Sequence, residues 1–198
     1  MDGLIRHLRL LAGIAGLALL CACQGTTFQT PPLAAGACDP GLSGRWISIN
    51  EDGRPDGEMV LVFSADCQLD VTDRSNGNLR EGDPTQVHVA QSGANGFMWV
   101  DAGWTAKRFD FADLAAHPGD VFLMRYSWDQ GELLFNDMDD KAVAHLIIDG
   151  KIPGTVDYED DRLLNRITGP ARPEVLTLPG VFSAEFGRFR RDDGNGKP

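Results

Sequence analysis

The sequence is poor in basic residues, with 18 Lys and Arg against 29 Asp and Glu and a formal net charge of −11. Binding to a nucleic acid backbone requires clustered Lys and Arg. Electrostatic attachment to anionic lipid requires the same kind of cluster. The composition therefore argues against both kinds of partner.

Recognisable catalytic motifs are also missing. The chain contains no G-x-S-x-G elbow, no H-E-x-x-H pair and no glycine-rich phosphate loop. The later histidines, His88, His117 and His145, lie far apart and match no ligand spacing. We therefore expect a protein that is not an enzyme and has no cofactor. A hydrolase is the weakest hypothesis, because it would need His88 or His145 beside a carboxylate.

The chain also lacks an apolar run long enough to span a bilayer. The run at residues 10–20 has about half of the ~20 residues that a transmembrane helix needs. It follows Arg6 and Arg9 and ends in the small-residue site Leu20-Cys21-Ala22-Cys23. This layout is typical of a secretory signal peptide. We expect residues 1–22 to be removed.

The tetrapeptide that ends at Cys23 resembles the bacterial lipobox, in which signal peptidase II cleaves before a lipidated cysteine. The resemblance implies that Cys23 carries diacylglycerol and fatty acyl chains such as palmitate. Two or three chains hold a protein stably on a membrane. The next residue is Gln24 rather than aspartate, which implies the outer membrane of the cell envelope, with the domain facing the periplasm. Residues 120–144 and 167–190 also resemble parts of uncharacterised bacterial lipoproteins.

The rest of the chain is expected to form one domain. Residues 23–37 are rich in Gly, Thr and Pro and predict a flexible tether. Residues 38–191 are enough for a single β-rich domain with its own core. Residues 192–198 predict a disordered tail.

Two cysteines remain once Cys21 and Cys23 are assigned. Cys38 and Cys67 form an even pair in an oxidising compartment, which favours a disulfide. Closing a loop of about 30 residues would stabilise the fold by roughly 3 to 4 kcal/mol. Zinc is the alternative, but neither a C-x-x-C spacing nor paired histidines support it.

Turn-forming residues divide the domain into many short strands. We expect strands at residues 45–50, 58–64, 68–72, 86–91, 96–100, 163–168 and 181–190, and a β-hairpin over residues 121–135. A helix capped by Asp139 and ended by Gly150 follows, and short helices are expected at residues 111–116 and 170–178. The fold class is therefore α+β and β-rich, an antiparallel sheet or partly closed β-barrel with two or three short helices.

Gly44-Arg45-Trp46 resembles the G-x-W motif that opens lipocalins, in which the tryptophan plugs the closed end of the barrel. The resemblance implies a carrier of a small apolar ligand, with candidate ligand-binding residues Trp46, Trp99, Trp104 and Trp128. Buried aromatic residues more often belong to a core. The competing hypothesis is a non-enzymatic module that binds another envelope component or has a structural role.

Two acidic clusters flank the expected helix. Asp137, Asp139 and Asp140 precede it, and Asp157 begins a second cluster that runs to residue 161. Such clusters can bind calcium, but the first lacks the glycine and glutamate of an EF-hand. Helix capping and a solvated acidic face explain them equally well, so we expect no metal site.

Overall fold

The computed structural model describes residues 24–50, 52–74, 82–93, 95–109, 117–159, 162–183 and 187–192. These residues contain the helices α2 (Ala102–Phe109) and α3 (Asp140–Ile148) and the 3₁₀ helix η2 (Pro173–Thr177). Among them, no helix is long and apolar enough to cross a membrane. The expected signal peptide at residues 1–22, Cys23, the helix expected at residues 111–116 and residues 193–198 of the expected tail lie outside the described residues.

One mixed sheet of 12 strands contains all the strands of the described ranges. The strands are β1 (Gln24–Phe28), β2 (Gly44–Ile49), β3 (Pro55–Phe63), β4 (Gln68–Asp73), β5 (Thr85–Gln86), β6 (His88–Ser92), β7 (Asn95–Asp101), β8 (Val121–Asp129), β9 (Glu132–Asn136), β10 (Gly154–Glu159), β11 (Arg162–Ile167) and β12 (Gly187–Arg191).

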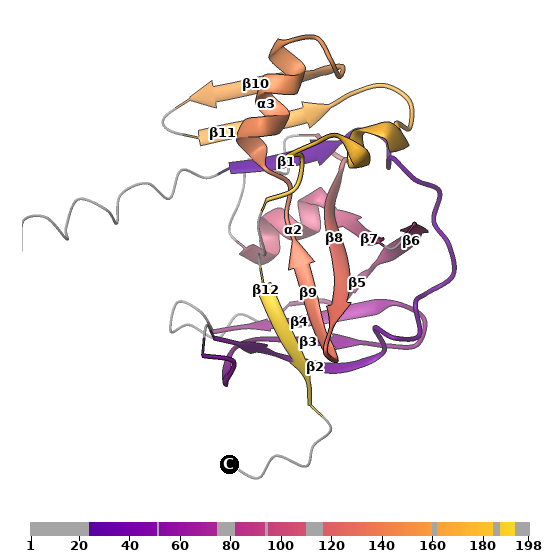
Figure 1. The fold of residues 1–198 in the computed structure, drawn as a ribbon, viewed down its shortest axis with the longest axis vertical. Coiled ribbons are helices and arrows are strands. Elements are labelled where there is room, and N and C mark those ends of the chain that lie inside the picture. Colours follow the sequence, from indigo (N-terminus) through magenta and orange to yellow (C-terminus); the bar gives the residue numbers. More distant parts are fainter. Residues whose placement is uncertain are drawn as a thin grey trace, which may run out of the picture.

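Most of these strands form a partly closed antiparallel barrel (Figure 1). Each strand pairs with the next in the order β6, β7, β8, β9, β12, β2, β3, β4 and β5. β5 and β6 follow each other along the chain with only Val87 between them and do not pair, so the ladder is interrupted there. At this seam the Val87 amide donates to the Cys67 carbonyl (2.9 Å). The predicted α+β, β-rich fold is confirmed, and the sheet remains partly open at this seam.

The barrel interior is filled by large apolar side chains. Leu133 and Met98 are 0% exposed, and Trp46, Phe135 and Phe189 are at most 5% exposed. They belong to one buried cluster with residues of β3, β4 and β6. Phe135 and Phe189 meet edge to face, with ring centroids 5.5 Å apart. The inward-facing residues therefore form a packed core.

Beyond the start of β8 the sheet continues through β1, β11 and β10, and α3 packs on these three strands (Figure 1). We call β1, β10, β11 and α3 the second layer. A second buried cluster, the second core, joins this layer to the barrel strands, because it contains Phe28, Ile167 and Val143 together with Leu123 and Trp99. The Arg166–Asp120 ion pair (2.7 Å) also joins β11 to the residue before β8.

Local sequence signals explain several elements. Asp139 caps α3 as predicted, since its Oδ1 accepts the Ala142 amide at 2.9 Å. Gly150, just after the helix, has a positive φ of 69°, as expected for a helix-ending glycine. The predicted hairpin is β8 and β9, and Gln130 and Gly131 both have positive φ at its turn, which is typical of a two-residue hairpin loop.

The tether prediction is wrong for residues 24–28. These residues form β1, which pairs in parallel with β11 and antiparallel with β8. Thr26 and Thr27 are 2% and 6% exposed. Thr26 Oγ1 donates to Asp140 Oδ1 (2.6 Å), and Thr27 Oγ1 donates to Asp120 Oδ2 (3.3 Å). The segment is therefore part of the folded domain, because its side chains are bonded on both faces.

Three further elements differ from the expectations. α2 lies at Ala102–Phe109, where no helix was expected. β10 was not predicted, because its exposed polar positions obscure the strand pattern. The parallel pairing of β1 with β11 makes the sheet mixed rather than purely antiparallel. In each case long-range packing determines the local structure.

Candidate functional site

The four tryptophans proposed as ligand-binding residues do not line one cavity. Trp99 is 3% exposed and belongs to the second core. Trp104 lies on α2, and its indole N–H donates to the Asp83 carbonyl (2.9 Å). Trp46 and Trp128 meet at the opposite end of the barrel, with ring centroids 5.3 Å apart. The structure thus brings together only two of the four.

Trp46, Tyr126, Trp128 and Arg191 form what we call the barrel-end cluster. The Tyr126 ring meets Trp128 edge to face at 6.4 Å, and the Arg191 guanidinium lies 4.6 Å from the centroid of the Trp46 ring. Such arrangements stabilise aromatic groups beyond simple burial. β2, β8 and β12 supply the four residues.

Arg191 fixes the loop that precedes β2. Its two terminal nitrogens donate to the carbonyls of Ser43 and Gly41, each at 2.7 Å. The Trp46 indole N–H donates to the Leu42 carbonyl, also at 2.7 Å. This end of the barrel is closed because the loop, the tryptophan and the arginine hold one another in place.

Tyr126 is held by a small polar network. Its hydroxyl donates to Asp39 Oδ2 (2.9 Å) and accepts from the Gln91 side-chain amide (2.9 Å). Burial raises the pKa of Tyr126, and the hydrogen bond and negative charge of Asp39 raise it further. Its ring covers Gly96, where an added Cβ would lie only 2.2 Å from the ring. Tyr126 is therefore a fixed, neutral donor.

Trp128 is the exposed aromatic residue of the barrel-end cluster, with 42% of its surface accessible; Arg191 is also exposed. It rests on Trp46 and on Gly41, where an added Cβ would lie 3.1 Å from the indole. A large aromatic side chain on a rigid support can bind a partner with little loss of conformational entropy. Sequence reasoning singled out Trp128 but missed Arg191, Tyr126 and Asp39, since only the fold joins them.

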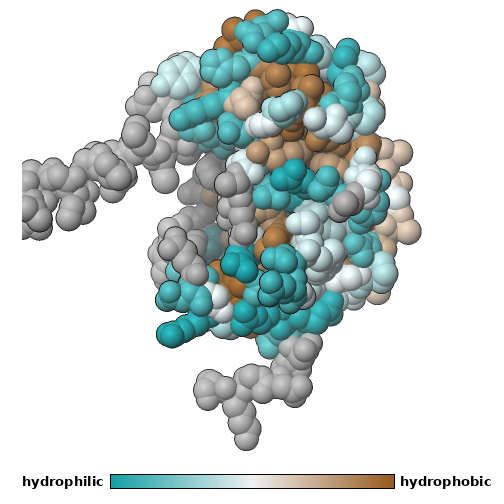
Figure 2. Space-filling model, viewed as in Figure 1, coloured by the Kyte–Doolittle hydropathy of each residue, from teal (hydrophilic) through white to brown (hydrophobic). Residues whose placement is uncertain are grey.

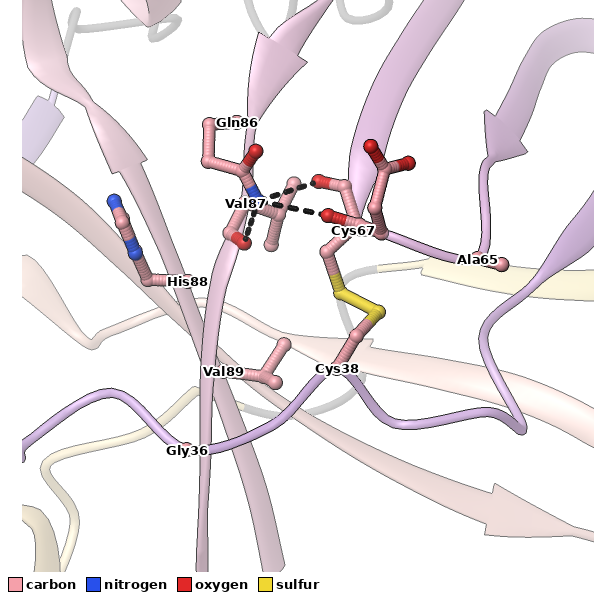
Figure 3. Close-up of a pocket in the computed structure, with 9 residues that line it drawn as sticks. Gly36, Cys38, Ala65, Cys67, Gln86, Val87, His88 and Val89 are labelled. Carbon is pink, nitrogen blue, oxygen red and sulfur yellow. Dashed lines mark hydrogen bonds between the residues drawn. A yellow bond between two sulfur atoms is a disulfide. The ribbon is translucent and has the colours of Figure 1, made fainter.

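The disulfide expected between Cys38 and Cys67 is confirmed. It crosses the seam of the barrel and borders a hollow of about 350 Å³ (Figure 3). None of the four tryptophans lines this hollow. The side-chain amide of Gln86 donates to the carbonyls of Asp66, Cys67 and Val87. The polar groups at the seam are thus already satisfied by one another.

His88 and Asp66 both border this hollow but do not form a catalytic pair. In Figure 3 the His88 side chain points away from the disulfide. Its ring stacks on Trp99, with centroids 5.9 Å apart. Asp66 instead accepts a hydrogen bond from the Ser64 hydroxyl. The geometry does not support the hydrolase hypothesis at this position.

The first acidic cluster is part of the structure around α3. Burial raises the pKa of Asp137 to about 7, and the charge of Asp140 adds to this effect. Burial likewise raises the pKa of Asp140 to about 6, although the Thr26 hydroxyl opposes the shift. Within the described ranges, no group of three or more His, Cys, Asp or Glu side chains could hold a metal ion. Capping thus explains Asp139 without calcium.

These raised pKa values predict a pH-dependent stability. A carboxyl group whose pKa is higher in the folded than in the unfolded state binds more protons when folded, so stability falls as pH rises from about 4 to about 7. Replacing Asp137 with Asn removes the buried charge and keeps an oxygen that can accept the Met138 amide. We expect D137N to gain about 1 kcal/mol or more relative to the wild type between pH 5 and pH 8.

Urea denaturation at several pH values measures this difference. Asp149→Asn is the matched control, because Asp149 makes an exposed ion pair with Lys151 at the other end of α3. If the free energy of unfolding changes with pH in the same way for the wild type and for D137N, the charged Asp137 carboxylate does not destabilise the fold.

Comparisons with known proteins found no match to the chain among family models, curated proteins or solved structures.

Proposed function

We propose that the protein is a lipid-anchored lipoprotein of the cell envelope whose domain is a non-enzymatic binding or structural module. The lipobox that ends at Cys23 supports the anchor. The packed barrel interior and the structural pairing of the buried charged groups Asp120 and Glu132 support a scaffold. On this proposal the domain acts through its surface, of which Figure 2 shows one face.

The observation that favours partner binding is the exposure of Trp128 on the barrel-end cluster. Tryptophan, tyrosine and arginine are the residues that most often dominate the energy of protein interfaces. Here all three types lie together, and hydrogen bonds to the loop before β2 hold Arg191 in place. A partner would contact Trp128, and Trp46, Tyr126 and Arg191 would hold the Trp128 ring in position.

A lipocalin-like carrier is the second candidate. The closed barrel end, where Arg191 covers Trp46, favours it. The filled interior opposes it, because an apolar ligand needs a cavity of about 300 Å³ or more and the inward-facing Leu133, Phe135 and Phe189 already pack together. Saturable binding of an apolar fluorescent probe, abolished by filling substitutions inside the barrel, would favour the carrier over the binding module.

Site-specific photo-cross-linking in the native host tests the binding module. A photoreactive residue replaces Trp128, and the control replaces Val62 of β3, which is 38% exposed. We expect one covalent adduct from position 128 and none from position 62. The purified partner should then bind the purified protein, and Trp128→Ala should weaken this binding by about tenfold or more.

Two outcomes would contradict the proposed binding surface. One is the same set of adducts from positions 128 and 62. The other is unchanged affinity of the purified partner for the Trp128→Ala variant. The thermal unfolding of this variant serves as the folding control, since the loss of a half-exposed side chain leaves the packed core intact.

A further inference from the structure

The start of β1 restricts where a membrane anchor can place the domain. Gln24 is the first residue of the strand, and it is bonded directly to Cys23. Gly25, Thr26, Thr27 and Phe28 are all buried. Because consecutive Cα atoms are about 3.8 Å apart, an acyl chain on Cys23 would join the folded sheet without an intervening linker.

The thickness of the headgroup layer sets the scale of this restriction. The polar region on each side of the hydrocarbon core is about 5 to 8 Å thick. A cysteine that carries diacylglycerol lies at the boundary between hydrocarbon and headgroups. Gln24 would then lie within the headgroup layer, together with the residues that neighbour it on the adjacent strands.

The fold places one end of the second layer beside Gln24. Gln24 pairs with Leu163 of β11, and Leu163 pairs with Tyr158 of β10. These three residues form a row across three strands, about 10 Å wide at the usual strand spacing. Tyr158 is 69% exposed. Tyrosine is favoured at membrane interfaces because its ring is apolar and its hydroxyl is polar.

We propose that this row, made of Gln24, Leu163 and Tyr158, lies in the headgroup layer of the bilayer when Cys23 is lipidated. The inference rests on the lipid anchor of the proposed function. Removal of residues 1–22, which contain Arg6, Arg9 and Asp2, changes the net charge from −11 to −12. This negative charge favours a zwitterionic rather than an anionic lipid surface.

This placement also orients the barrel. Val121, at the start of β8, pairs with Phe28 of β1, whereas Trp128 lies near the other end of the same strand. Seven residues of strand span about 23 Å. Figure 1 shows the second layer and the β2 and β3 end of the barrel at opposite ends of the long axis. Trp128 would therefore be held away from the membrane surface, where an envelope partner can reach it.

Spin labels on the lipidated protein in phosphatidylcholine vesicles test the proposal. The labelled positions are Tyr158→Cys and, as a matched exposed control on β3, Val62→Cys. Cys38 and Cys67 are joined to each other and do not react with the label. We expect the label at position 158 to become severalfold less accessible to a water-soluble nickel complex on vesicles, while the label at position 62 does not change.

A spacer variant tests the headgroup contact separately from the lipid anchor. Ten Gly and Ser residues inserted between Cys23 and Gln24 should leave the protein bound to vesicles but restore the accessibility at position 158. If the protein floats with vesicles and the two labels are equally accessible, the headgroup contact is wrong and the anchor stands. If the protein carries no lipid on Cys23 and does not float with vesicles, the anchor and the contact both fail.

Discussion

Replacing Phe28 with Ala is expected to lower the free energy of unfolding by about 3 to 5 kcal/mol, the usual cost of deleting a buried aromatic ring. Phe28 is 1% exposed and packs in the second core with Ile167 and Val143. In a flexible tether the same substitution would cost almost nothing. Chemical denaturation of the two proteins measures the difference.

Thr30→Ala is the matched control for this experiment, because Thr30 lies two residues further along and is exposed. Its midpoint should remain close to that of the wild type. Equal midpoints for Phe28→Ala and Thr30→Ala would mean that β1 is not part of the stable domain in solution. The membrane contact inferred from the start of β1 would then lose its basis.

Removing the disulfide is expected to lower the free energy of unfolding by about as much as Phe28→Ala does. The Cys38→Ala, Cys67→Ala variant loses a cross-link between residues 29 positions apart, which corresponds to about 3 to 4 kcal/mol in the chain-entropy model. The bond also holds the segment before β2 against the seam between β5 and β6, where the ladder is interrupted. Thermal unfolding at neutral pH measures the loss.

The wild type treated with a reductant provides the control, because it lacks the cross-link but keeps both sulfur atoms. Its midpoint should fall close to that of the double variant. If the oxidised wild type and the double variant unfold at the same temperature, the disulfide does not restrain the domain.

Much of the fold could be predicted from short-range signals. The β8 and β9 hairpin followed from two apolar runs around a turn, and α3 followed from Asp139 and Gly150 at its ends. The disulfide followed from the even pair of cysteines that remains after the expected export signal. In these cases residues near one another in the sequence carry the information, so no knowledge of the packing was required.

β1 could not be predicted in the same way. Its sequence contains two threonines and a phenylalanine, which favour strands, but the glycine and the prolines around it indicated a tether. What makes it a strand is pairing with β11, more than 130 residues later in the chain. The same limitation applies to Arg191, whose contact with Trp46 joins the last described strand to the second.

The proposed anchor and the proposed binding surface belong to different parts of the domain. Cys23 precedes β1 in the second layer, and Trp128 lies at the closed end of the barrel. Between them β8 runs as one strand that pairs with β1 near its start and with β9 near its end. A partner that binds at Trp128 would therefore be held at a fixed distance from the membrane.

Mass spectrometry of the N-terminal peptide, from protein purified out of native host membranes, tests the central claim most directly. We expect the mature chain to begin at Cys23 and this residue to carry two or three acyl chains. An unmodified N-terminus upstream of Cys23 would contradict the lipid anchor, and with it the proposed placement of the domain on the membrane.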